Sequence, residues 1–208
     1  MSESLELGDA WRVCFESAWE AFRAGTIPVG AAVTSADGTV VARGRNRTFD
    51  APGYGVSGSR LAHAEVDALA QLPTSARYRD HVLYSTLEPC LLCVAATLHA
   101  TVGRIEYAAA DPFGGGCVGT IDTVHWRRSA PEIAEPREDW WAARLSAALQ
   151  SAFWQEHSER RNAPQIIAAF GEEARVAGGR VIERKDALPA EFEDAFPQLV
   201  DCLQTPLP

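Results

Sequence analysis

The sequence predicts an α/β fold in which helices cover a mixed sheet, and three observations support this prediction. Between Asp9 and Ala24 the apolar residues recur at three- and four-residue steps, as in an amphipathic helix. The valine-containing segments 27–34 and 39–42 flank Ala36-Asp37-Gly38, and an Asp-Gly pair in this position predicts a hairpin. Further along, short β-rich runs alternate with helical segments, which implies parallel pairing in part of the sheet.

Chain breakers and hydrophobic periodicity define the remaining elements. Glycines and Pro52 predict a loop over 49–59. The elements expected after it are a helix over 62–72 ended by Pro73, a strand over 81–86, a helix over 90–100, a strand over 104–109 and a long helix over 138–161. Beyond Pro164 the periodicity weakens, and no further element is predicted there.

The composition of the chain limits the size of its core and the partners that it can bind. With 208 residues, 47% of them hydrophobic, the chain can bury one sizeable core. The formal charge of -9 disfavours a polynucleotide partner, because nucleic-acid binding normally uses a basic surface. Residues 162–208 add to this charge with eight acids against four bases.

Targeting signals and cysteine usage indicate the compartment. The longest apolar stretches, such as 91–98, are far shorter than the roughly 20 residues of a membrane-spanning helix, and residues 1–9 carry acids in place of a basic leader. Five cysteines, an odd number, favour reduced thiols or metal ligands over a disulfide framework. We therefore expect a cytoplasmic protein without a membrane anchor.

Two short clusters carry the chemistry, His63-Ala64-Glu65 and Pro89-Cys90-Leu91-Leu92-Cys93, and each opens a predicted helix. Cys90 and Cys93 are three residues apart, so they lie on one helical face and can bind one ion, and Pro89 suits the first turn of the helix. A Cys-x-x-Cys pair alone is ambiguous between zinc, redox chemistry and core packing. With His63 as third ligand, the pattern predicts a catalytic zinc whose fourth position is left for water.

Glu65 is expected to move protons and not to bind the metal. It can take a proton from the water and return it to the reacting molecule. Because residues two apart on an ideal helix point about 200° apart, the ion must lie off the end of the helix and not beside it. The alternative is a closed structural zinc site with Cys117 or His99 as fourth ligand. Packing or surface roles are expected for the remaining histidines and cysteines: His81, His125, His157, Cys14 and Cys202.

H-x-E followed by P-C-x-x-C resembles the zinc signature of the cytidine deaminase-like superfamily. Within it, the chain looks like the branch of tRNA adenosine deaminases and purine-base (guanine) deaminases. The supporting segments are Ile27-Pro28-Val29-Gly30-Ala31, Gly44-Arg45-Asn46-Arg47, Thr86-Leu87-Glu88-Pro89-Cys90 and 104–111. The likeness covers roughly residues 9–161.

The resemblance implies a three-layer α/β/α sandwich with a mixed, about five-stranded sheet. It also implies Zn²⁺ bound by His63, Cys90 and Cys93, with Glu65 as the catalytic proton shuttle. Asn46 and the backbone of Ala64 would bind the base, and the loop at Asp111 would complete the site of a neighbouring subunit in a homodimer. Residues 1–161 would then form a zinc-dependent deaminase domain, and 162–208 an acidic C-terminal extension of unknown role.

The expected activity is hydrolytic deamination of a small nucleobase or nucleoside, with a purine base such as guanine slightly favoured. A tRNA adenosine deaminase is the first alternative, and it would be favoured if Arg127, Arg128, Arg160 and Arg161 gathered beside the pocket. A non-catalytic, zinc-stabilised interaction domain is the second. Arg43, Arg45 and Arg47 share one face of a strand, either as a solvated edge or as contacts for the phosphate of a nucleotide substrate.

Overall fold

The computed structural model describes the chain except for residues 1–5, 54, 117–123, 135–139 and 205–208. In chain order the elements are α1 (Asp9–Arg23), β1 (Gly30–Thr34), β2 (Val40–Arg45), α2 (Ala64–Leu69), β3 (Val82–Leu87), α3 (Leu91–His99), β4 (Arg104–Ala109), α4 (Val124–Ser129), β5 (Glu132–Ile133), α5 (Trp141–Glu156), α6 (Ala163–Arg184) and α7 (Phe192–Gln204). Over the described residues, no helix combines the length and the apolar character needed to cross a bilayer.

The sheet has five strands in the order β2-β1-β3-β4-β5. β1 is antiparallel to both β2 and β3, whereas β3, β4 and β5 run parallel, so the expected mixed sheet is confirmed. The hairpin between β1 and β2 forms as predicted, with Gly38 at a φ of 86° and the Ser35 hydroxyl donating to Asp37. β5 and α4 were not predicted individually from the sequence.

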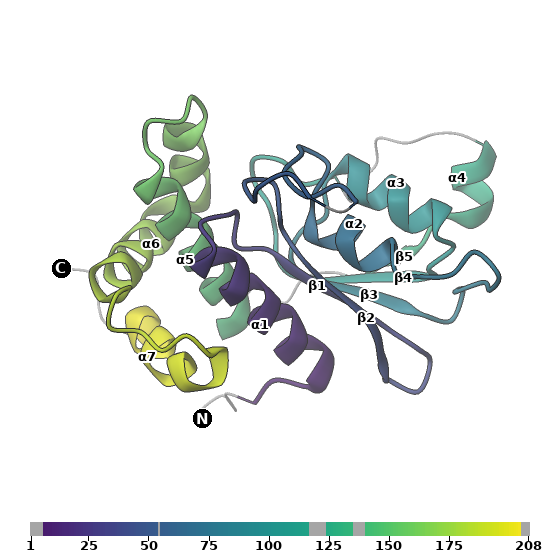
Figure 1. Ribbon diagram of the computed structural model, residues 1–208, viewed down its shortest axis with the longest axis horizontal. Coiled ribbons are helices and arrows are strands. Elements are labelled where there is room, and N and C mark those ends of the chain that lie inside the picture. The colour runs from purple at the N-terminus through teal and green to yellow at the C-terminus, as the bar shows by residue number, and fades with distance from the viewer. Residues whose placement is uncertain (1–5, 54, 117–123, 135–139, 205–208) are drawn as a thin grey trace.

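Helices cover both faces of the sheet, as a three-layer sandwich requires. Figure 1 shows α2, α3 and α4 on one side, and α1 and α5 on the other. One core cluster lies under α2 and α3 and includes Val33, Leu83 and Ile105. A second joins α1 and α5 through Phe15, Trp19 and Phe153, among others. The helices that carry the two chemical clusters therefore rest on a rigid sheet.

The C-terminal part of the chain differs from the prediction. The long helix expected over 138–161 is shorter: α5 ends at Glu156, because His157 leaves the helical conformation (φ -114°, ψ 39°). Two helices then follow where none was expected. Gly171, with a φ of 85°, interrupts α6, and Pro197 lies inside α7, so helix breakers hid the pattern.

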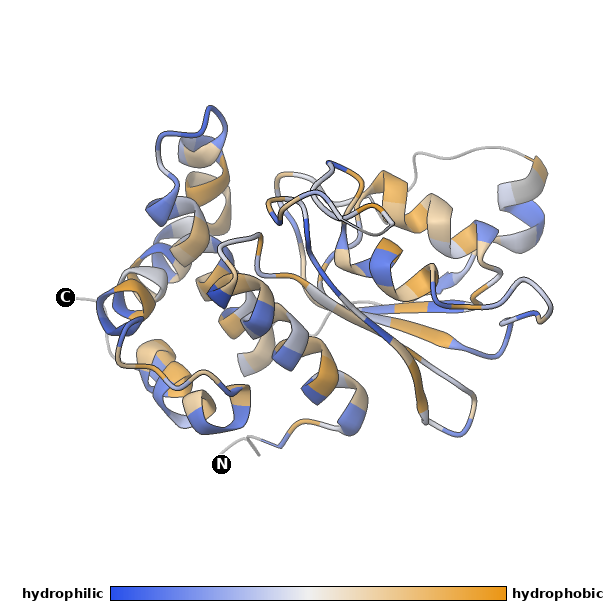
Figure 2. Ribbon diagram, in the orientation of Figure 1, coloured by the Kyte–Doolittle hydropathy of each residue, from blue (hydrophilic) through white to orange (hydrophobic). Residues whose placement is uncertain are grey.

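Residues after 162 share the core of α1 and α5. Ala177, Val181, Phe192 and Leu199 are buried in the same cluster as Trp19 and Phe153. Figure 2 shows hydrophilic and hydrophobic bands along α6 and α7, as expected of helices with one buried face, whereas α3 is mainly hydrophobic. The acidic composition of this segment reflects the outer faces of packed helices.

Candidate metal centre

The two predicted clusters meet at the beginnings of α2 and α3. His63 is the N-cap residue of α2 and Cys90 is the N-cap residue of α3, while Cys93 lies in the first turn of α3. His63 Nδ1 is 3.5 Å from Cys90 Sγ and 3.4 Å from Cys93 Sγ, and the two sulfurs are 3.5 Å apart. One position is corrected: Pro89 precedes the N-cap and so lies outside the first turn.

These three atoms fit a tetrahedral zinc ion. Zinc bonds of about 2.3 Å to sulfur and about 2.0–2.1 Å to nitrogen place tetrahedral ligands about 3.6–3.8 Å apart. The observed separations of 3.4–3.5 Å are slightly shorter and need little movement. Because His63 lies one position before the helix, an ion bound by it would lie off the end of α2, as predicted.

The two cysteines shift each other's pKa in opposite directions. Their mutual hydrogen bond lowers the pKa of Cys90 to about 4, with a further contribution from His63. The same hydrogen bond, together with burial, raises the pKa of Cys93. Metal binding requires both thiols to be deprotonated, so a bound cation would release the proton of Cys93.

Of the two proposed fourth ligands, the structure describes His99, which does not lie at the site. His99 is the last residue of α3 and lies at the opposite end of that helix from Cys90. Cys117 lies outside the described residues. Among the residues that the structure describes, the group of candidate ligands at this point consists of His63, Cys90 and Cys93. Three protein ligands leave room for water, which is typical of catalytic zinc.

Glu65 lies beside the three ligands, and its carboxyl group is 3% exposed. The Ser85 hydroxyl donates to Glu65 Oε1 over 3.1 Å, and Oε2 lies 3.3 Å from Cys93 Sγ. Burial raises the pKa of the Glu65 carboxyl, which the positive charge of His63 opposes. A buried carboxyl with a raised pKa next to a metal site is suited to accept and return a proton. Ser85, whose side chain reaches Glu65 from β3, was not among the predicted site residues.

A cavity of about 300 Å³ opens in front of this group. Asn46, His63, Glu65, Cys90 and Asp111 all line it, so the structure brings together five of the seven predicted site residues around one space. Cys93 is buried behind it as a ligand. Ala64, the first residue of α2, is fully buried and is absent from the cavity wall.

Asn46 is held with its amide group in one orientation. Its Oδ1 accepts hydrogen bonds from the Thr26 hydroxyl at 3.0 Å and from the Thr48 backbone N–H at 2.9 Å. Both lone pairs of Oδ1 are therefore used. Within the described part of the chain the Nδ2 group has no protein partner, so the side chain offers the cavity a donor and no acceptor.

Asp111 shapes the loop that forms another wall. Its Oδ1 accepts from the backbone N–H groups of Phe113 and Gly114, both at 2.9 Å. Glu88, which the sequence analysis did not single out, accepts from the Asp111 N–H at 3.2 Å. The run leading into Pro89-Cys90 thus also fixes the loop after β4.

Residues 6–109 match the family model described as the cytidine and deoxycytidylate deaminase zinc-binding region. The chain belongs to this deaminase family.

Individual relatives agree with this assignment. A tRNA-specific adenosine deaminase of Agrobacterium fabrum is 39% identical over 93 residues, 43% of this chain and 56% of that protein. A tRNA(Ile)-lysidine synthase of Deinococcus radiodurans is 39% identical over 105 residues, 48% of this chain but only 17% of that protein. A solved structure from work on A-to-I editing by tRNA:A34 deaminases superposes with a TM-score of 0.54 and 28% identity, covering 67% of this chain and 97% of that one. The chain thus spans about a sixth of the length of the lysidine synthase and just over half of the length of the adenosine deaminase.

Carboxylates bind each arginine of the row formed by Arg43, Arg45 and Arg47. Arg43 pairs with Glu20, and Arg45 binds Asp50 through two hydrogen bonds of 2.8 and 3.1 Å. Arg47 is 3.2 Å from Asp67. The row therefore supports the loop after β2, and a phosphate would have to displace an acid from each arginine.

The cavity in front of Glu65 also has wall residues that were not predicted from the sequence. Gln150 of α5 is 2% exposed and donates to the Pro28 carbonyl at 3.1 Å. Asn162, Ile166 and Phe170 come from the segment whose role was unknown. Gln150 was detectable as a polar residue on an apolar helix face, whereas the other three depend on how α6 folds back.

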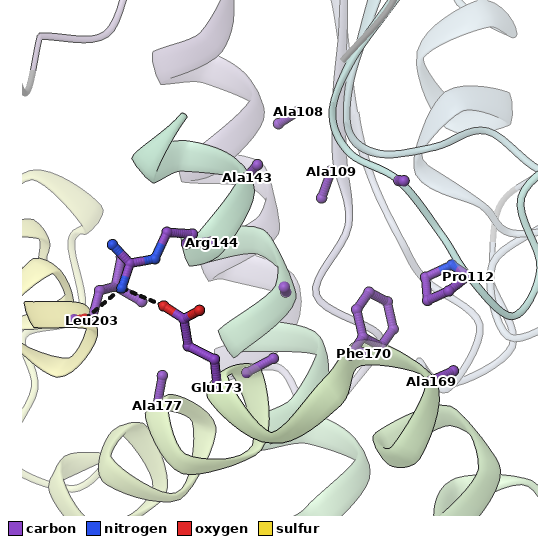
Figure 3. A pocket seen from close by; sticks show the side chains of 13 residues that line it. Ala108, Ala109, Pro112, Ala143, Arg144, Ala169, Phe170, Glu173, Ala177 and Leu203 are labelled. Atoms are coloured by element: carbon purple, nitrogen blue, oxygen red, sulfur yellow. Dashed lines mark hydrogen bonds and ion pairs between the residues drawn. The ribbon is translucent and has the colours of Figure 1, made fainter. Parts of the chain in front are cut away.

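A second cavity, of about 340 Å³, adjoins the first and shares Phe170 with it. Figure 3 shows alanines and Phe170 around this space, with Arg144 linking Glu173 to the Leu203 carbonyl at its edge. The side chain of Arg144 donates to the carbonyl over 2.8 Å, which fixes the end of α7 against α5. α6 therefore separates two cavities, and only one of them reaches the zinc ligands.

Proposed function

We propose that this deaminase replaces the exocyclic amine of a purine base with a carbonyl oxygen, consuming water and releasing ammonia. The observation that carries the proposal is the buried Glu65 carboxyl beside three zinc ligands at the end of a cavity sized for one base. Likeness to adenosine deaminases favours a purine over a pyrimidine.

The reaction needs a proton carrier and an orienting group. Zinc, when bound, supplies Lewis-acid chemistry that lowers the pKa of water. Glu65 takes the proton released by the attacking water and delivers it to a ring nitrogen. Glu65 then takes the second proton, from the hydroxyl group now attached to the ring carbon, and delivers it to the exocyclic amine as the carbon–nitrogen bond breaks. Ammonia leaves, the carbonyl forms, the ring nitrogen keeps the first proton, and one carboxyl group serves both transfers. The Ser85 hydroxyl donates to Glu65 Oε1, and Oε2 lies 3.3 Å from Cys93 Sγ, on the side of the metal ligands.

Asn46 is proposed to orient the base through a single donated hydrogen bond. Its occupied Oδ1 supports this direction, since only Nδ2 remains for a ring nitrogen or carbonyl. We retain the backbone of Ala64 as a second contact to the base, and Asp111 as the residue that orders the wall loop. The hydrogen bonds of Asp111 to Phe113 and Gly114 support the latter role.

A tRNA adenosine deaminase is the second candidate. The similarity to a tRNA-specific adenosine deaminase favours it. Arg160 and Arg161 line a space next to the cavity of about 300 Å³ in front of Glu65, which we call the base cavity. Arg127 and Arg128 lie on α4 and line neither this neighbouring space nor the base cavity. The acidic net charge of -9 weighs against a large nucleic-acid surface.

We also propose that the deaminase forms a homodimer through the face around α3. Leu61, Leu91, Leu92 and Phe113 are large apolar residues that are each at least 39% exposed. Leu61 is two residues from His63, and Leu91 and Leu92 lie between Cys90 and Cys93. Burial of these side chains would favour association. Light scattering should report twice the mass of 22.5 kDa, and Leu91→Glu should yield monomer.

The test of the activity is ammonia release from guanine, adenine, cytosine and their nucleosides by zinc-loaded protein. Glu65→Gln should retain one zinc ion and its fold but reduce the rate by about 10²–10⁴-fold. Glu191→Gln, at an exposed residue before α7, is the matched control and should be unaffected. Full activity of Glu65→Gln would reject Glu65 as the proton carrier. No ammonia from any member of the panel would favour the non-catalytic, zinc-stabilised interaction domain.

A further inference from the structure

A third cavity, of about 740 Å³, adjoins the base cavity and is lined by three arginines, Arg60, Arg160 and Arg161. The two spaces share four wall residues, which are Ile27, His63, Trp154 and Asn162. A molecule whose base reached Glu65 would therefore continue into the arginine cavity. Among the described residues, no aspartate or glutamate lines this space, although the whole chain has a net charge of -9.

Arg160 is positioned by aromatic rings and hardly at all by acids. Its guanidinium carbon lies 3.8 Å from the centre of the Phe49 ring, and Phe49 in turn stacks on Phe153. The nearest carboxylate contact is Glu159 at 4.0 Å. The Arg160 Nε atom is buried and has no hydrogen-bond partner. A buried donor without an acceptor is costly, so this group is poised for an acceptor from a ligand.

Arg60 and Arg161 are exposed at the same cavity. Over the described ranges, no carboxylate forms an ion pair with either side chain, in contrast to Arg43, Arg45 and Arg47, which are each neutralised. The three cavity arginines come from two segments far apart in the sequence, the loop before α2 and the turn between α5 and α6. Folding thus concentrates uncompensated positive charge beside the zinc ligands.

We propose that Arg60, Arg160 and Arg161 bind the phosphate of a nucleotide whose base is deaminated at Glu65. Guanidinium groups recognise phosphate oxygens through paired, charge-assisted hydrogen bonds. A mononucleotide fits better than an RNA strand, because a strand needs an extended basic surface and the neighbouring arginines are bound to acids. This inference rests on the proposed function, since it assigns the substrate class of the same site.

The test compares the affinity of nucleosides and their 5′-monophosphates by calorimetry, using zinc-loaded Glu65→Gln protein so that no probe is consumed. Adenosine with AMP, guanosine with GMP and cytidine with CMP are the probes. At least one monophosphate should bind about tenfold or more tightly than its nucleoside. Combining Arg60→Ala and Arg161→Ala should abolish this preference while the affinity for the nucleoside stays the same.

Arg77→Ala is the matched control, because Arg77 is an exposed arginine that lines a different cavity. It should preserve the preference for the monophosphate. Equal affinity for nucleosides and monophosphates, or a preference that survives the double substitution, would overturn the proposal. A five-residue RNA that binds more than tenfold better than every mononucleotide would overturn the assignment to a mononucleotide.

Ammonia release by the wild-type enzyme separates this inference from the proposed function. Release from a free base without any preference for phosphate supports the deaminase activity and rejects the arginine site. Arginine-dependent binding of a monophosphate without ammonia release from any compound supports the phosphate site and rejects the proposed activity.

Discussion

Substitution of Gly44 in β2 by alanine should displace the metal centre. A Cβ atom at this position would lie 2.3 Å from the Ala64 carbonyl oxygen, 2.5 Å from the Ala68 nitrogen and 2.9 Å from Asp67 Cβ. Ordinary contact begins at 3.4 Å, so the first of these falls short by 1.1 Å. The atoms in the way belong mainly to the backbone of α2, and no side-chain rotation can remove them. Gly44→Ala must therefore move the helix.

The magnitude follows from what α2 carries. His63 is its N-cap and Glu65 lies in its first turn, so a shift of about 1 Å moves a zinc ligand and the proton carrier together. Displacement of this size in a catalytic group costs about 10²-fold in rate. Overpacking should also lower the free energy of unfolding by about 1–3 kcal/mol.

The assay is kcat/KM for ammonia release, together with zinc affinity and the thermal midpoint. Gly53→Ala is the permissive control, because its nearest neighbour would be 3.8 Å away. Gly30→Ala is the steric control, since its Cβ would strike Cys14 of α1, a helix without zinc ligands. Gly30→Ala should lower stability with a smaller loss of zinc affinity. The reasoning is refuted if Gly44→Ala keeps wild-type zinc affinity and a rate within a few-fold.

Three further outcomes are expected. Asn46→Asp keeps the oxygen that accepts from Thr26 and Thr48 but removes the Nδ2 donor. The thermal midpoint should therefore change little, while KM for the base rises. An unchanged KM would argue against contact between Asn46 and the substrate. Leu199 of α7 is fully buried, so Leu199→Ala should lower the free energy of unfolding of the whole chain, measured in urea, by about 2–5 kcal/mol. If the substitution changed only a separate unfolding transition, residues 162–208 would fold as an independent unit. Removing zinc with a chelator should abolish ammonia release and lower the thermal midpoint, because zinc at 100 times its dissociation constant stabilises the fold by about 2.7 kcal/mol.

The zinc ligands could be predicted because they lie in two short motifs whose spacing is local. His63 and Glu65 are two residues apart, and Cys90 and Cys93 are three apart, so each pair keeps its geometry wherever the chain places it. The hairpin at Asp37-Gly38 and the stripe of α1 are local for the same reason. Local signals also gave two wrong predictions. Pro89 was expected in the first turn of α3 but lies before it, and the helix expected to reach residue 161 ends at Glu156.

The orientation of Asn46 could not be predicted, because it depends on Thr26, which is 20 residues away in the sequence. The partners of the arginines could not be predicted either. Arg43, Arg45 and Arg47 were visible in the sequence as a row, but only the fold shows that each forms an ion pair with a carboxylate. Arg60 and Arg160 are 100 positions apart, and no periodicity connects them.

By itself, the sequence predicted the metal-ligand group of His63, Cys90 and Cys93 and the class of fold, since helix and strand periods and ligand spacing act over a few residues. Only the tertiary structure decided the shape of the substrate cavity. Its walls combine Asn46 after β2, Gln150 of α5 and Phe170 of α6, which meet because α5 and α6 bury apolar faces against each other and against the sheet. Burial of those faces fixes which polar groups remain available to a substrate.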